Sequence, residues 1–355
     1  MRTLVVSDLH LGARTRVDVL RRPAAIEALA RAAGGADRTV LLGDVLELRH
    51  GPARESLAVA EPALRALGEA AGEVVLVAGN HDHRLVRPWL EARGATAVAP
   101  PLRLDEELPA DATPSIERIA EMLAPARLEV RYPGVWLRED VFATHGHQLD
   151  VLTTVPAFER LGIGAIARIW GTPLPERATA DDFEAKLAPL YSLLDALAER
   201  KGPGVPAKGS VRAWELLNKD GRRPWKGALA TPLVLLAIAA VNRAGIGPVE
   251  AEFTGVALRR AGVLGMREAL RRLGIDAPHV LFGHTHRAGP RRGDDLAEWG
   301  PLLNTGCWVH EPTFTKGGPG SPYWPGRAAI VDDEGPPRLV GLLDDVPVST
   351  LRARP

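Results

Sequence analysis

Polar residues that could hold a metal ion follow several apolar runs of this sequence. The first run ends in "SDLHLG", where Asp8 and His10 stand two residues apart. In an extended segment this spacing turns both side chains to the same side, so the two could bind one ion. The run "HVLFGHTH" ends with His284 and His286 in the same alternation. An aspartate alone at such a place is more often a cap or turn residue, so the histidine pair is the stronger indication.

Three further runs end in residues of the same kind. "LLGDVLE" contributes Asp44, "AGNHD" contributes Asn80, and "THGHQ" contributes His145 and His147. Each has an ordinary explanation as a turn or loop residue when considered alone. Chance turn chemistry would not favour imidazole so consistently at five run ends. The set offers oxygen and imidazole ligands without thiolate, which suits Mn²⁺, Fe or Zn²⁺, and it is enough for two ions that share a carboxylate.

The apolar runs themselves predict the strands of a buried sheet. Six of them are short and stop at glycine or a polar cluster, as strands buried on both faces do: "TLVVSDLH", "TVLLGDVLE", "VVLVAGNHD", "VFATHGHQLD", "HVLFGHTH" and "LLNTGCW". Helical segments at 21–35 and 55–73 separate the first three runs. This alternation predicts an α/β fold and, taken alone, one parallel sheet with ligands bound beyond the carboxyl ends of its strands.

A long helical segment interrupts the strand pattern. Within it, "FEAKLAPLYSLLDALAER" predicts a helix whose buried face carries Phe183, Leu187, Leu190, Leu194 and Leu197. The sequence therefore predicts a core domain made of residues 1–150 and 276–345, a helical insertion at 151–275 that acts as a cap or interaction subdomain, and a tail at 346–355. A smaller excursion at 104–126 precedes "LEVRYPGVWLRED", which is expected to form a hairpin that turns at Pro133 and Gly134.

The insertion also contains "LATPLVLLAIAAV" at 229–241, which is apolar all round. It is shorter than the roughly 20 residues that a membrane-spanning helix needs, so a buried helix is expected, with contact to a membrane surface as the alternative. The preceding "GRRPWKG" mixes basic residues with tryptophan. Residues 221–241 are therefore the candidate segment for peripheral membrane contact.

Composition limits the classes of partner and compartment. Lys+Arg and Asp+Glu both number 44, so no overall charge draws the chain to nucleic acid, and no extended nucleic-acid footprint is expected. The single cysteine, Cys307, excludes an internal disulfide and is interpreted as a small buried hydrophobe. With no secretory signal pattern at "MRTLVVSDLHLG", a cytoplasmic location is expected, with attachment to the membrane surface as the alternative.

The ordered set D-x-H, G-D, G-N-H-D, H-G-H and G-H-x-H resembles the calcineurin-like metallophosphoesterase superfamily. The resemblance covers residues 1–150 and 277–343. It implies a sandwich of two mixed β-sheets packed together and flanked by helices, in place of a single parallel sheet. It also implies two divalent metal ions, with Mn²⁺ as the first choice and Fe or Zn²⁺ as alternatives. The implied ligands are Asp8, His10 and His286 for one ion, Asn80, His145 and His284 for the other, and Asp44 as the bridge.

The resemblance further implies that His81 of "GNHD" binds no metal. It would serve as general acid or charge stabiliser, with Asp44 and Asp82 setting its orientation or charge, while a metal-bridging hydroxide attacks phosphorus in line. An imidazole, whose ordinary pKa is about 6.5, can hold or release a proton near neutrality. The expected activity is hydrolysis of a phosphodiester or pyrophosphate. The nearby His83 is interpreted as an ordinary loop residue.

A closer likeness concerns the branch that contains UDP-2,3-diacylglucosamine pyrophosphatase. It rests on "SDLHLG", "GDVLEL" and a helical insertion that could cap an acyl chain. Typical members of that branch carry G-N-R-D and H-G-D, where this chain has His81 and His147, and the insertion here is longer. The substrate is therefore expected only as a phosphoester linked to a nucleotide or a lipid.

Arginines beside the strand ends are the candidate substrate ligands. Arg14, Arg84 and Arg87 could bind phosphate groups in bidentate fashion, although solvated loop charge is the ordinary explanation of each. Two other functions stay open: a nuclease or cyclic-nucleotide phosphodiesterase with the same two-metal core, and a non-catalytic scaffold that binds partners through the insertion. A scaffold is expected to have lost metal ligands, and this chain has the full set. The sequence does not indicate an oligomeric state.

Overall fold

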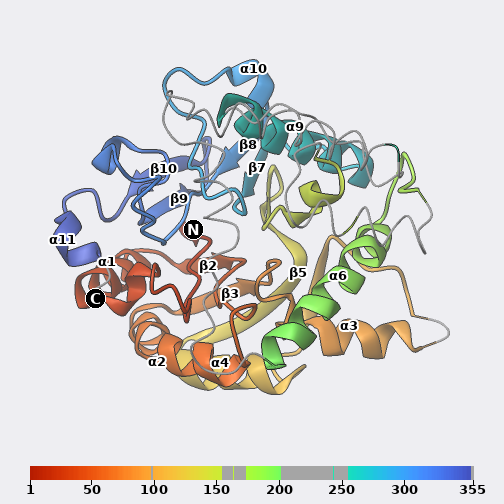
Figure 1. The fold of residues 1–355 in the computed structure, drawn as a ribbon, viewed down its shortest axis with the longest axis horizontal. Coiled ribbons are helices and arrows are strands. Elements are labelled where there is room, and N and C mark those ends of the chain that lie inside the picture. The colour runs from red at the N-terminus through yellow and green to blue at the C-terminus, as the bar shows by residue number, and fades with distance from the viewer. Residues whose placement is uncertain (97–98, 154–162, 164–172, 201–242, 244–254, 353–355) are drawn as a thin grey trace, which may run out of the picture. The chain divides into compact units, whose positions relative to one another are not determined.

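The computed structural model describes residues 1–96, 99–153, 163, 173–200, 243 and 255–352 (Figure 1). The apolar run at 229–241 and the candidate membrane segment 221–241 lie outside them. The chain divides into two compact units, of which the first contains Met1–His147, Tyr191–Val205 and Ala277–Pro355, and the second Gln148–Leu190 and Pro206–Asp276. The expected domain limits stay a prediction. From Tyr191, however, the helix that begins at Ala180 belongs to the same unit as the sheet.

Ten strands of the described residues form one curled sheet. Its centre is parallel and consists of β1 (Thr3–Val6), β2 (Arg38–Leu42), β3 (Glu73–Val77) and the first half of β5 (Arg127–Arg138). On the β1 side, β9 (Arg327–Val331) and β10 (Arg338–Gly341) continue the sheet in antiparallel order. On the other side, the strands are β6 (Val141–Thr144), antiparallel to β5, and then β7 (His279–Phe282) and β8 (Leu302–Asn304) in parallel, while β4 (Asp105–Leu108) pairs with β5.

The sheet curls so that its two halves share one apolar core. A single cluster of buried residues includes Val5, Val40 and Val75 from the parallel centre and Val135, Val141 and Leu281 from the other half. The mixed α/β fold is therefore as expected. The expected separation into two sheets is not seen as such, because the long strand β5 pairs with β3 through its first half and with β6 through its second.

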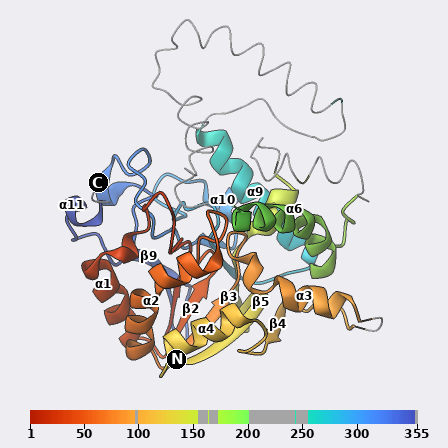
Figure 2. The same cartoon turned by 60° about the horizontal axis from the view of Figure 1, so that its bottom comes forward.

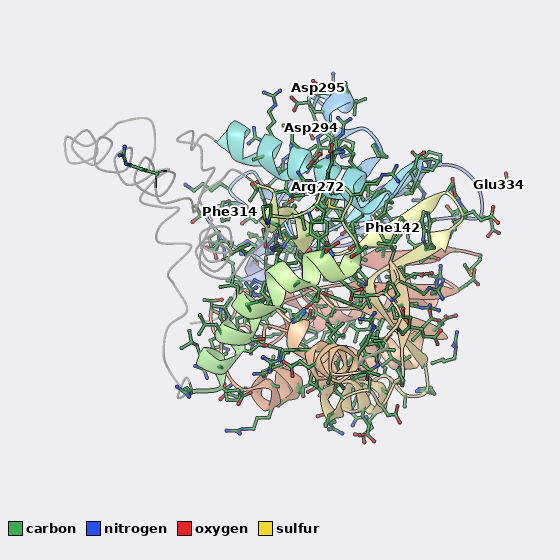
Figure 3. The ribbon with its side chains drawn as sticks, turned by 90° about the vertical axis from the view of Figure 1, so that its right-hand side faces the viewer. Phe142, Arg272, Asp294, Asp295, Phe314 and Glu334 are labelled. Atoms are coloured by element: carbon green, nitrogen blue, oxygen red, sulfur yellow. The ribbon has the colours of Figure 1, made fainter. Side chains whose placement is uncertain are left out.

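All six strands predicted from the apolar runs are present, but the predicted hairpin at Pro133 and Gly134 is wrong. Both residues lie inside β5, which continues to Arg138. Gly134 is needed where the strand meets β6, because a Cβ there would lie 2.5 Å from Cζ of Phe142. The Phe142 ring is buried and packs against Trp136 at 5.1 Å (Figure 3). The Pro-Gly pair thus marks the change of strand partner, and it does not mark a turn.

Three helices lie side by side in the first unit (Figures 1 and 2). They are α1 (Pro23–Gly34), α2 (Ala53–Ala70) and α4 (Pro114–Leu123), and the first two are the helices predicted between strands. Three helices are shorter. Two of them follow strand-end loops, α3 (Arg87–Gly94) and α10 (Leu296–Trp299), and one lies near the carboxyl end of the chain, α11 (Val348–Leu351). Leu351 of α11 is buried, so part of the expected tail packs as structure.

The helix predicted from "FEAKLAPLYSLLDALAER" is α6 (Ala180–Arg200). Phe183, Leu187 and Leu190 are buried as expected and Leu194 is half-buried, but Leu197 is 48 % exposed, so its assignment to the buried face is wrong. The buried row continues instead through Tyr191, Asp195 and Ala198, one helical turn apart. The reason is an ion pair: Asp195 lies 3.0 Å from Arg87, which fixes that side of the helix inward.

The described part of the second unit centres on the first half of α6 and on α9 (Gly255–Leu273). Thr179 and Asp182 bond reciprocally at the start of α6, with the Asp182 N–H 3.2 Å from Thr179 Oγ1 and the Thr179 N–H 2.8 Å from Asp182 Oδ2. Near the end of α9, Arg272 (Figure 3) donates to the carbonyl oxygens of Leu174 and Pro175 at 3.1 Å. None of the helices in the described ranges has the length and apolar character required to cross a membrane.

Candidate metal centre

The five strand-end segments predicted to carry ligands come together in the structure. Asp8, Asp44 and Asn80 follow β1, β2 and β3, His145 follows β6, and His284 follows β7. The Asp and His side chains among them, with those of His10, His81 and His286, form three overlapping groups, and within each group the potential ligand atoms lie within 4.8 Å of one another. The groups are Asp8, His10 and His286; His10, Asp44 and His81; and Asp44, His145 and His284.

The distances divide the centre into two halves joined by Asp44. In one half, Nε2 of His286 lies 3.0 Å from Nε2 of His10 and 3.3 Å from Oδ1 of Asp8. In the other half, Oδ1 of Asn80 lies 3.1 Å from Nε2 of His145 and 3.0 Å from Nδ1 of His284. Oδ2 of Asp44 lies 3.7 Å from Nε2 of His10 and 3.3 Å from Nε2 of His145, and so borders both halves.

This donor set fits divalent metal ions. Ligand atoms bound at about 2.0–2.2 Å from one ion lie about 3.0–3.5 Å from each other, which is the separation found within each half. The amide oxygen of Asn80 faces imidazole nitrogens and the Asp44 carboxylate, groups that all carry lone pairs. An oxygen turned toward other acceptors is what a shared cation requires.

The backbone at the ligands is unusual. Five of the seven predicted ligands have positive φ, with values of 55° at Asp8, 46° at His10, 52° at Asp44, 65° at His284 and 59° at His286. Residues other than glycine rarely adopt this left-handed region, and such conformations cluster at functional sites. The sequence gives no direct signal for this, because each position carries an ordinary L-residue.

Glycines before the ligands allow the side chains to approach the backbone. A Cβ on Gly79 would lie 2.3 Å from Oδ1 of Asp44, and one on Gly283 would lie 2.4 Å from Oδ2 of Asp8. No real Cβ tolerates such contacts. The glycine that precedes the ligand in "GNHD" and "GHTH" is therefore part of the centre, because it leaves space for a ligand supplied by another strand.

Hydrogen bonds on the outer side of the ligands fix which ring nitrogen faces inward. Nδ1 of His145 donates to the carbonyl oxygen of Leu42 at 3.0 Å, so Nε2 is the nitrogen that faces the inner side. Nδ1 of His10 is held in the same way by Oε2 of Glu47 at 3.2 Å. The hydroxyl of Ser7 donates to Oδ2 of Asp8 at 2.5 Å and lies 2.7 Å from the hydroxyl of Thr305. Such outer contacts orient metal ligands and tune their basicity.

Buried carboxylates and histidines of the centre stabilise each other's charge. Burial alone would raise the pKa of Asp44, but His145, His81 and His10 hold that pKa well below its ordinary value. Burial would likewise lower the pKa of His145, but the carboxylates of Asp44 and Asp8 raise it to about 9. The carboxylates are therefore ionised and attract positive charge to the centre.

A sequence model of the calcineurin-like phosphoesterase family matches residues 1–288. The chain belongs to this family. The family typically binds divalent metal ions, in agreement with the donor set at the strand ends. The search of curated proteins gives no match to the chain. The superfamily resemblance is thus confirmed, while the likeness to the pyrophosphatase branch stays a prediction.

Beside the predicted metal ligands lies a residue that the sequence patterns did not indicate. Glu47 is 2 % exposed, and its Oε2 lies 2.9 Å from Nδ1 of His81 as well as 3.2 Å from Nδ1 of His10. Burial would raise the pKa of Glu47, but His81, His10 and His50 hold it well below its ordinary value. A glutamate inside the apolar run "DVLEL" was the available signal, because a charge among leucines is seldom buried without a partner.

His81, the predicted general acid, lies at the edge of the centre with its side chain 24 % exposed. Its backbone N–H donates to Oδ1 of Asp44 at 2.8 Å, which fixes the backbone of His81 beside that carboxylate. Because Glu47 occupies Nδ1, the ring presents Nε2 on its other side, 3.4 Å from Nη1 of Arg49. His81 also belongs to a potential ligand group with His10 and Asp44, so its assignment as a non-ligand stays a prediction.

Asp82, predicted to act together with His81, is completely buried and has a different set of contacts. Its Oδ1 accepts from the N–H of Gly79 at 2.6 Å and of Asp44 at 3.3 Å, and its Oδ2 accepts from Val45 at 2.7 Å and Leu46 at 3.2 Å. Burial and the neighbouring Asp44 raise the pKa of Asp82 to about 6. These contacts indicate that Asp82 holds the loop after β2 against the loop after β3.

The three arginines predicted to bind substrate each have a carboxylate partner. Arg14 lies 3.0 Å from Glu55, Arg84 lies 2.6 Å from Glu199, and Arg87 lies 3.0 Å from Asp195. The partners of Arg84 and Arg87 are both on the second half of α6. These two arginines therefore anchor a helix beside the centre, and their assignment to substrate is untested.

Two further histidines form an aromatic cluster behind the metal ligands. His83, interpreted from the sequence as a loop residue, is 1 % exposed and packs on Tyr191 at 5.1 Å. His147 is completely buried, 5.7 Å from His145 and stacked on Tyr132. Neither ring nitrogen of His147 has a hydrogen-bond partner among the described residues, and burial together with His145, His284 and His83 keeps its pKa well below the ordinary value. His147 is therefore a neutral core residue.

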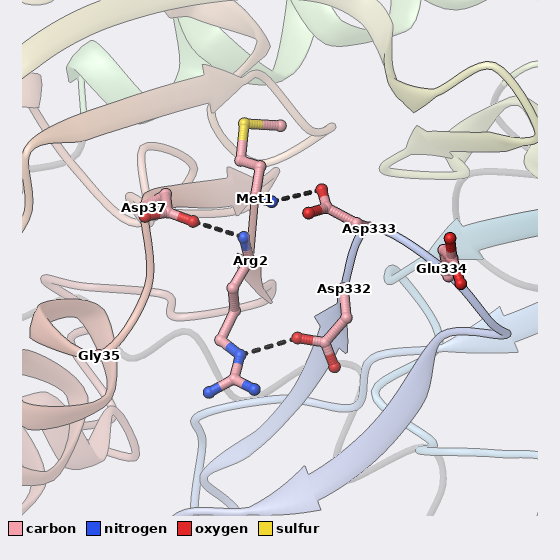
Figure 4. Close-up of a pocket in the computed structure, with 7 residues that line it drawn as sticks. All are labelled: Met1, Arg2, Gly35, Asp37, Asp332, Asp333 and Glu334. Atoms are coloured by element: carbon pink, nitrogen blue, oxygen red, sulfur yellow. Dashed lines mark hydrogen bonds and ion pairs between the residues drawn. The ribbon is translucent and has the colours of Figure 1, made fainter.

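Other polar groups lie away from the ligands. A pocket of about 650 Å³ is lined by Met1, Arg2, Asp37 and the acidic turn Asp332–Glu334 (Figure 4). It is at the amino end of β1, opposite the end that leads to Asp8, and Arg2 is paired there with Asp332 at 2.8 Å. In the loop after His286, Arg287 forms two hydrogen bonds to Asp294, at 3.0 and 2.6 Å (Figure 3). Cys307 is 1 % exposed, as expected of a small buried hydrophobe.

Proposed function

We propose that this protein hydrolyses a phosphodiester or a pyrophosphate with two divalent metal ions held at the strand ends. The observation that carries the proposal is the place of Asp44, whose Oδ2 lies within 3.3 Å of His145 Nε2 and 3.7 Å of His10 Nε2. A carboxylate that borders two groups of ligands is suited to bridge two ions. Asp8, His10 and His286 would hold one ion, and Asn80, His145 and His284 the other.

The ligand types favour Mn²⁺, with Fe or Zn²⁺ as alternatives, because they are imidazole, carboxylate and amide oxygen. When bound, a pair of such ions polarises the phosphoryl group and lowers the pKa of water so that hydroxide is available near neutral pH. The protein residues direct the inner ring nitrogens toward the place of the ions. Leu42 and Glu47 do this by accepting the Nδ1 protons of His145 and His10.

His81 would supply the proton to the leaving oxygen. Glu47 accepts the Nδ1 proton of His81 at 2.9 Å, so the ring protonated on both nitrogens would donate toward a substrate from Nε2. The partly exposed ring borders His10 and Asp44, where the reacting group would bind. Glu47 thereby fixes one predicted ligand and the predicted general acid with a single oxygen atom, which couples their positions.

For the substrate we propose a phosphoester linked to a nucleotide or a lipid, in keeping with the likeness to the pyrophosphatase branch. His81 replaces the arginine of that branch's G-N-R-D motif. An imidazole can transfer a proton near neutral pH, whereas a guanidinium cannot. This difference supports hydrolysis with proton donation to the leaving group, and it argues against an identical substrate. A cytoplasmic location belongs to the same proposal.

The experiment is metal removal and replacement. Protein stripped with a chelator is reloaded separately with Mn²⁺, Fe²⁺ and Zn²⁺, and turnover is compared for bis(p-nitrophenyl) phosphate, p-nitrophenyl phosphate, UDP-sugars and cyclic nucleotides. We expect no turnover in the stripped protein, recovery with two equivalents of metal, and preference for a diester or pyrophosphate. Preference for the monoester would contradict the proposed reaction, and inactivity on all four with two ions bound would favour the scaffold.

A further inference from the structure

Arg49 places a guanidinium group at the edge of the metal centre. The residue is 9 % exposed, and its Nη1 lies 3.4 Å from Nε2 of His81. Its Nη1 and Nη2 also lie 3.2 Å from the outer atom of the Asn80 side-chain amide. When the Asn80 oxygen faces His145 and His284, that outer atom is the amide nitrogen. Arg49 and Asn80 then meet as two donors, and an oxygen atom of a substrate could accept from both.

The guanidinium of Arg49 is held from its face by an aromatic ring of α6. Cζ of Arg49 lies 5.2 Å from the ring centroid of Tyr191, a distance at which a cation is attracted to an aromatic face. The ring itself is 1 % exposed and packs against His83 at 5.1 Å and His147 at 6.0 Å. A cation–π contact uses the face of a guanidinium, whereas phosphate oxygens are bound in bidentate fashion by its in-plane N–H groups, so the two contacts are compatible.

The position of Tyr191 is in turn fixed by the ion pairs of α6. Asp195 lies one helical turn after Tyr191 and is 3.0 Å from Arg87, and Glu199 lies a further turn along and is 2.6 Å from Arg84. Asp195 is almost completely buried, so its ion pair is little weakened by solvent. The segment Tyr191–Arg200, which is part of the predicted insertion, is thus attached to the loop and helix that follow Asn80 and His81.

We propose that Arg49 binds a non-bridging phosphoryl oxygen of the substrate and that Tyr191 is the positioning residue that holds its guanidinium in place. This inference rests on the proposed phosphoester hydrolysis and assigns a substrate ligand to it. The positive charge of Arg49 suits a phosphoryl oxygen, and its N–H groups lie beside both His81 and Asn80, where the reacting group would bind. The insertion helix consequently contributes to substrate affinity without supplying a metal ligand.

The test measures phosphate binding and kinetics on the same variants of the full chain loaded with Mn²⁺. Binding of inorganic phosphate is followed by calorimetry, and KM and kcat are measured with bis(p-nitrophenyl) phosphate. Arg49→Gln is expected to raise both the phosphate Kd and KM at least tenfold with two metal equivalents retained. Tyr191→Leu is expected to raise both about threefold to tenfold, and Tyr191→Phe, which keeps the ring, is expected to restore most of the affinity.

The double variant distinguishes positioning from an independent effect. If Tyr191 acts through Arg49, Arg49→Gln with Tyr191→Leu binds phosphate no more weakly than Arg49→Gln alone. Additive losses would overturn the positioning role, and an unchanged phosphate Kd in Arg49→Gln would overturn the whole proposal even if Tyr191→Leu fails to fold. Arg65→Gln, on the exposed side of α2, is the matched control for loss of an arginine. A wild type that binds phosphate through Arg49 but hydrolyses no ester would contradict the proposed function and leave this inference standing.

Discussion

The carboxylate of Glu47 lies 2.9 Å from Nδ1 of His81, and its side chain is only 3 % exposed. The same oxygen holds His10, a predicted metal ligand, at 3.2 Å. The predicted proton donor and a predicted metal ligand are therefore oriented by one buried charge. The loop after β2 thus contributes Glu47 to the centre as well as Asp44, the predicted bridge.

Replacement of Glu47 by Gln tests this shared contact. The amide keeps the shape of the side chain but removes the charge that accepts two Nδ1 protons, so we expect turnover or metal affinity to fall about 10- to 100-fold, as for other outer contacts of metal ligands. Steady-state kinetics and metal analysis on the same sample measure the effect. Glu61→Gln, on the solvent-facing side of α2, is the control. Wild-type kinetics in Glu47→Gln would show that the contact has no part in the reaction.

His81→Ala separates proton donation from metal binding. We expect turnover to fall about 10²- to 10⁴-fold, the usual contribution of a positioned general acid, while two metal equivalents remain. A leaving group that needs no proton, such as p-nitrophenolate, should show the smaller loss. Because His81 forms a potential ligand group with His10 and Asp44, metal content is the decisive measurement. Loss of one equivalent would make His81 a ligand.

Asp82→Asn should act through stability. An asparagine side chain has one acceptor oxygen and an N–H₂ group, so it cannot replace a carboxylate that accepts from four backbone N–H groups. Hydrogen bonds to a buried charge are worth about 1.5–3 kcal/mol each, and we expect the free energy of unfolding to fall by about 3 kcal/mol or more. Urea unfolding of the metal-free protein measures it. An unchanged stability with reduced turnover would support the catalytic role predicted from the sequence.

Gly79→Ala tests the close approach of the strands at the centre. The added Cβ would lie 2.3 Å from Oδ1 of Asp44, so the carboxylate of this predicted bridge must move, and we expect loss of at least one metal equivalent. Gly72→Ala provides the comparison, because a Cβ there meets nothing within 4 Å. Calorimetric titration with Mn²⁺ distinguishes the two. Equal metal binding by both variants would mean that the loop relaxes at little cost.

Some parts of this structure were predictable from the sequence because they depend on local patterns. The six strands follow from continuous apolar runs, and the gathering of Asp8, Asp44, Asn80, His145 and His284 follows from their place at strand ends. The hairpin at Pro133 and Gly134 was predicted wrongly because the same dipeptide suits a turn and a change of strand partner. Local sequence does not distinguish these two cases.

Long-range contacts account for what the sequence did not reveal. Arg84 and Arg87, predicted as phosphate ligands, have ion-pair partners on α6 more than one hundred residues later in the chain, which local sequence does not indicate. Arg49 attracted no attention because its neighbours Tyr191 and Asn80 come from distant segments. Glu47 likewise depends on a distant partner, His81, although a charged residue among leucines is a local signal for a buried, paired carboxylate.

The left-handed backbone at five predicted ligands also affects which substitutions would stabilise this protein. Each such residue costs about 1–3 kcal/mol, and glycine would adopt the same conformation without that cost. Substitutions such as His284→Gly should therefore relieve backbone strain in the metal-free fold while they abolish metal binding. Stability alone would therefore favour glycine at these positions, and the Asp and His side chains found there carry a cost in stability that metal binding would offset.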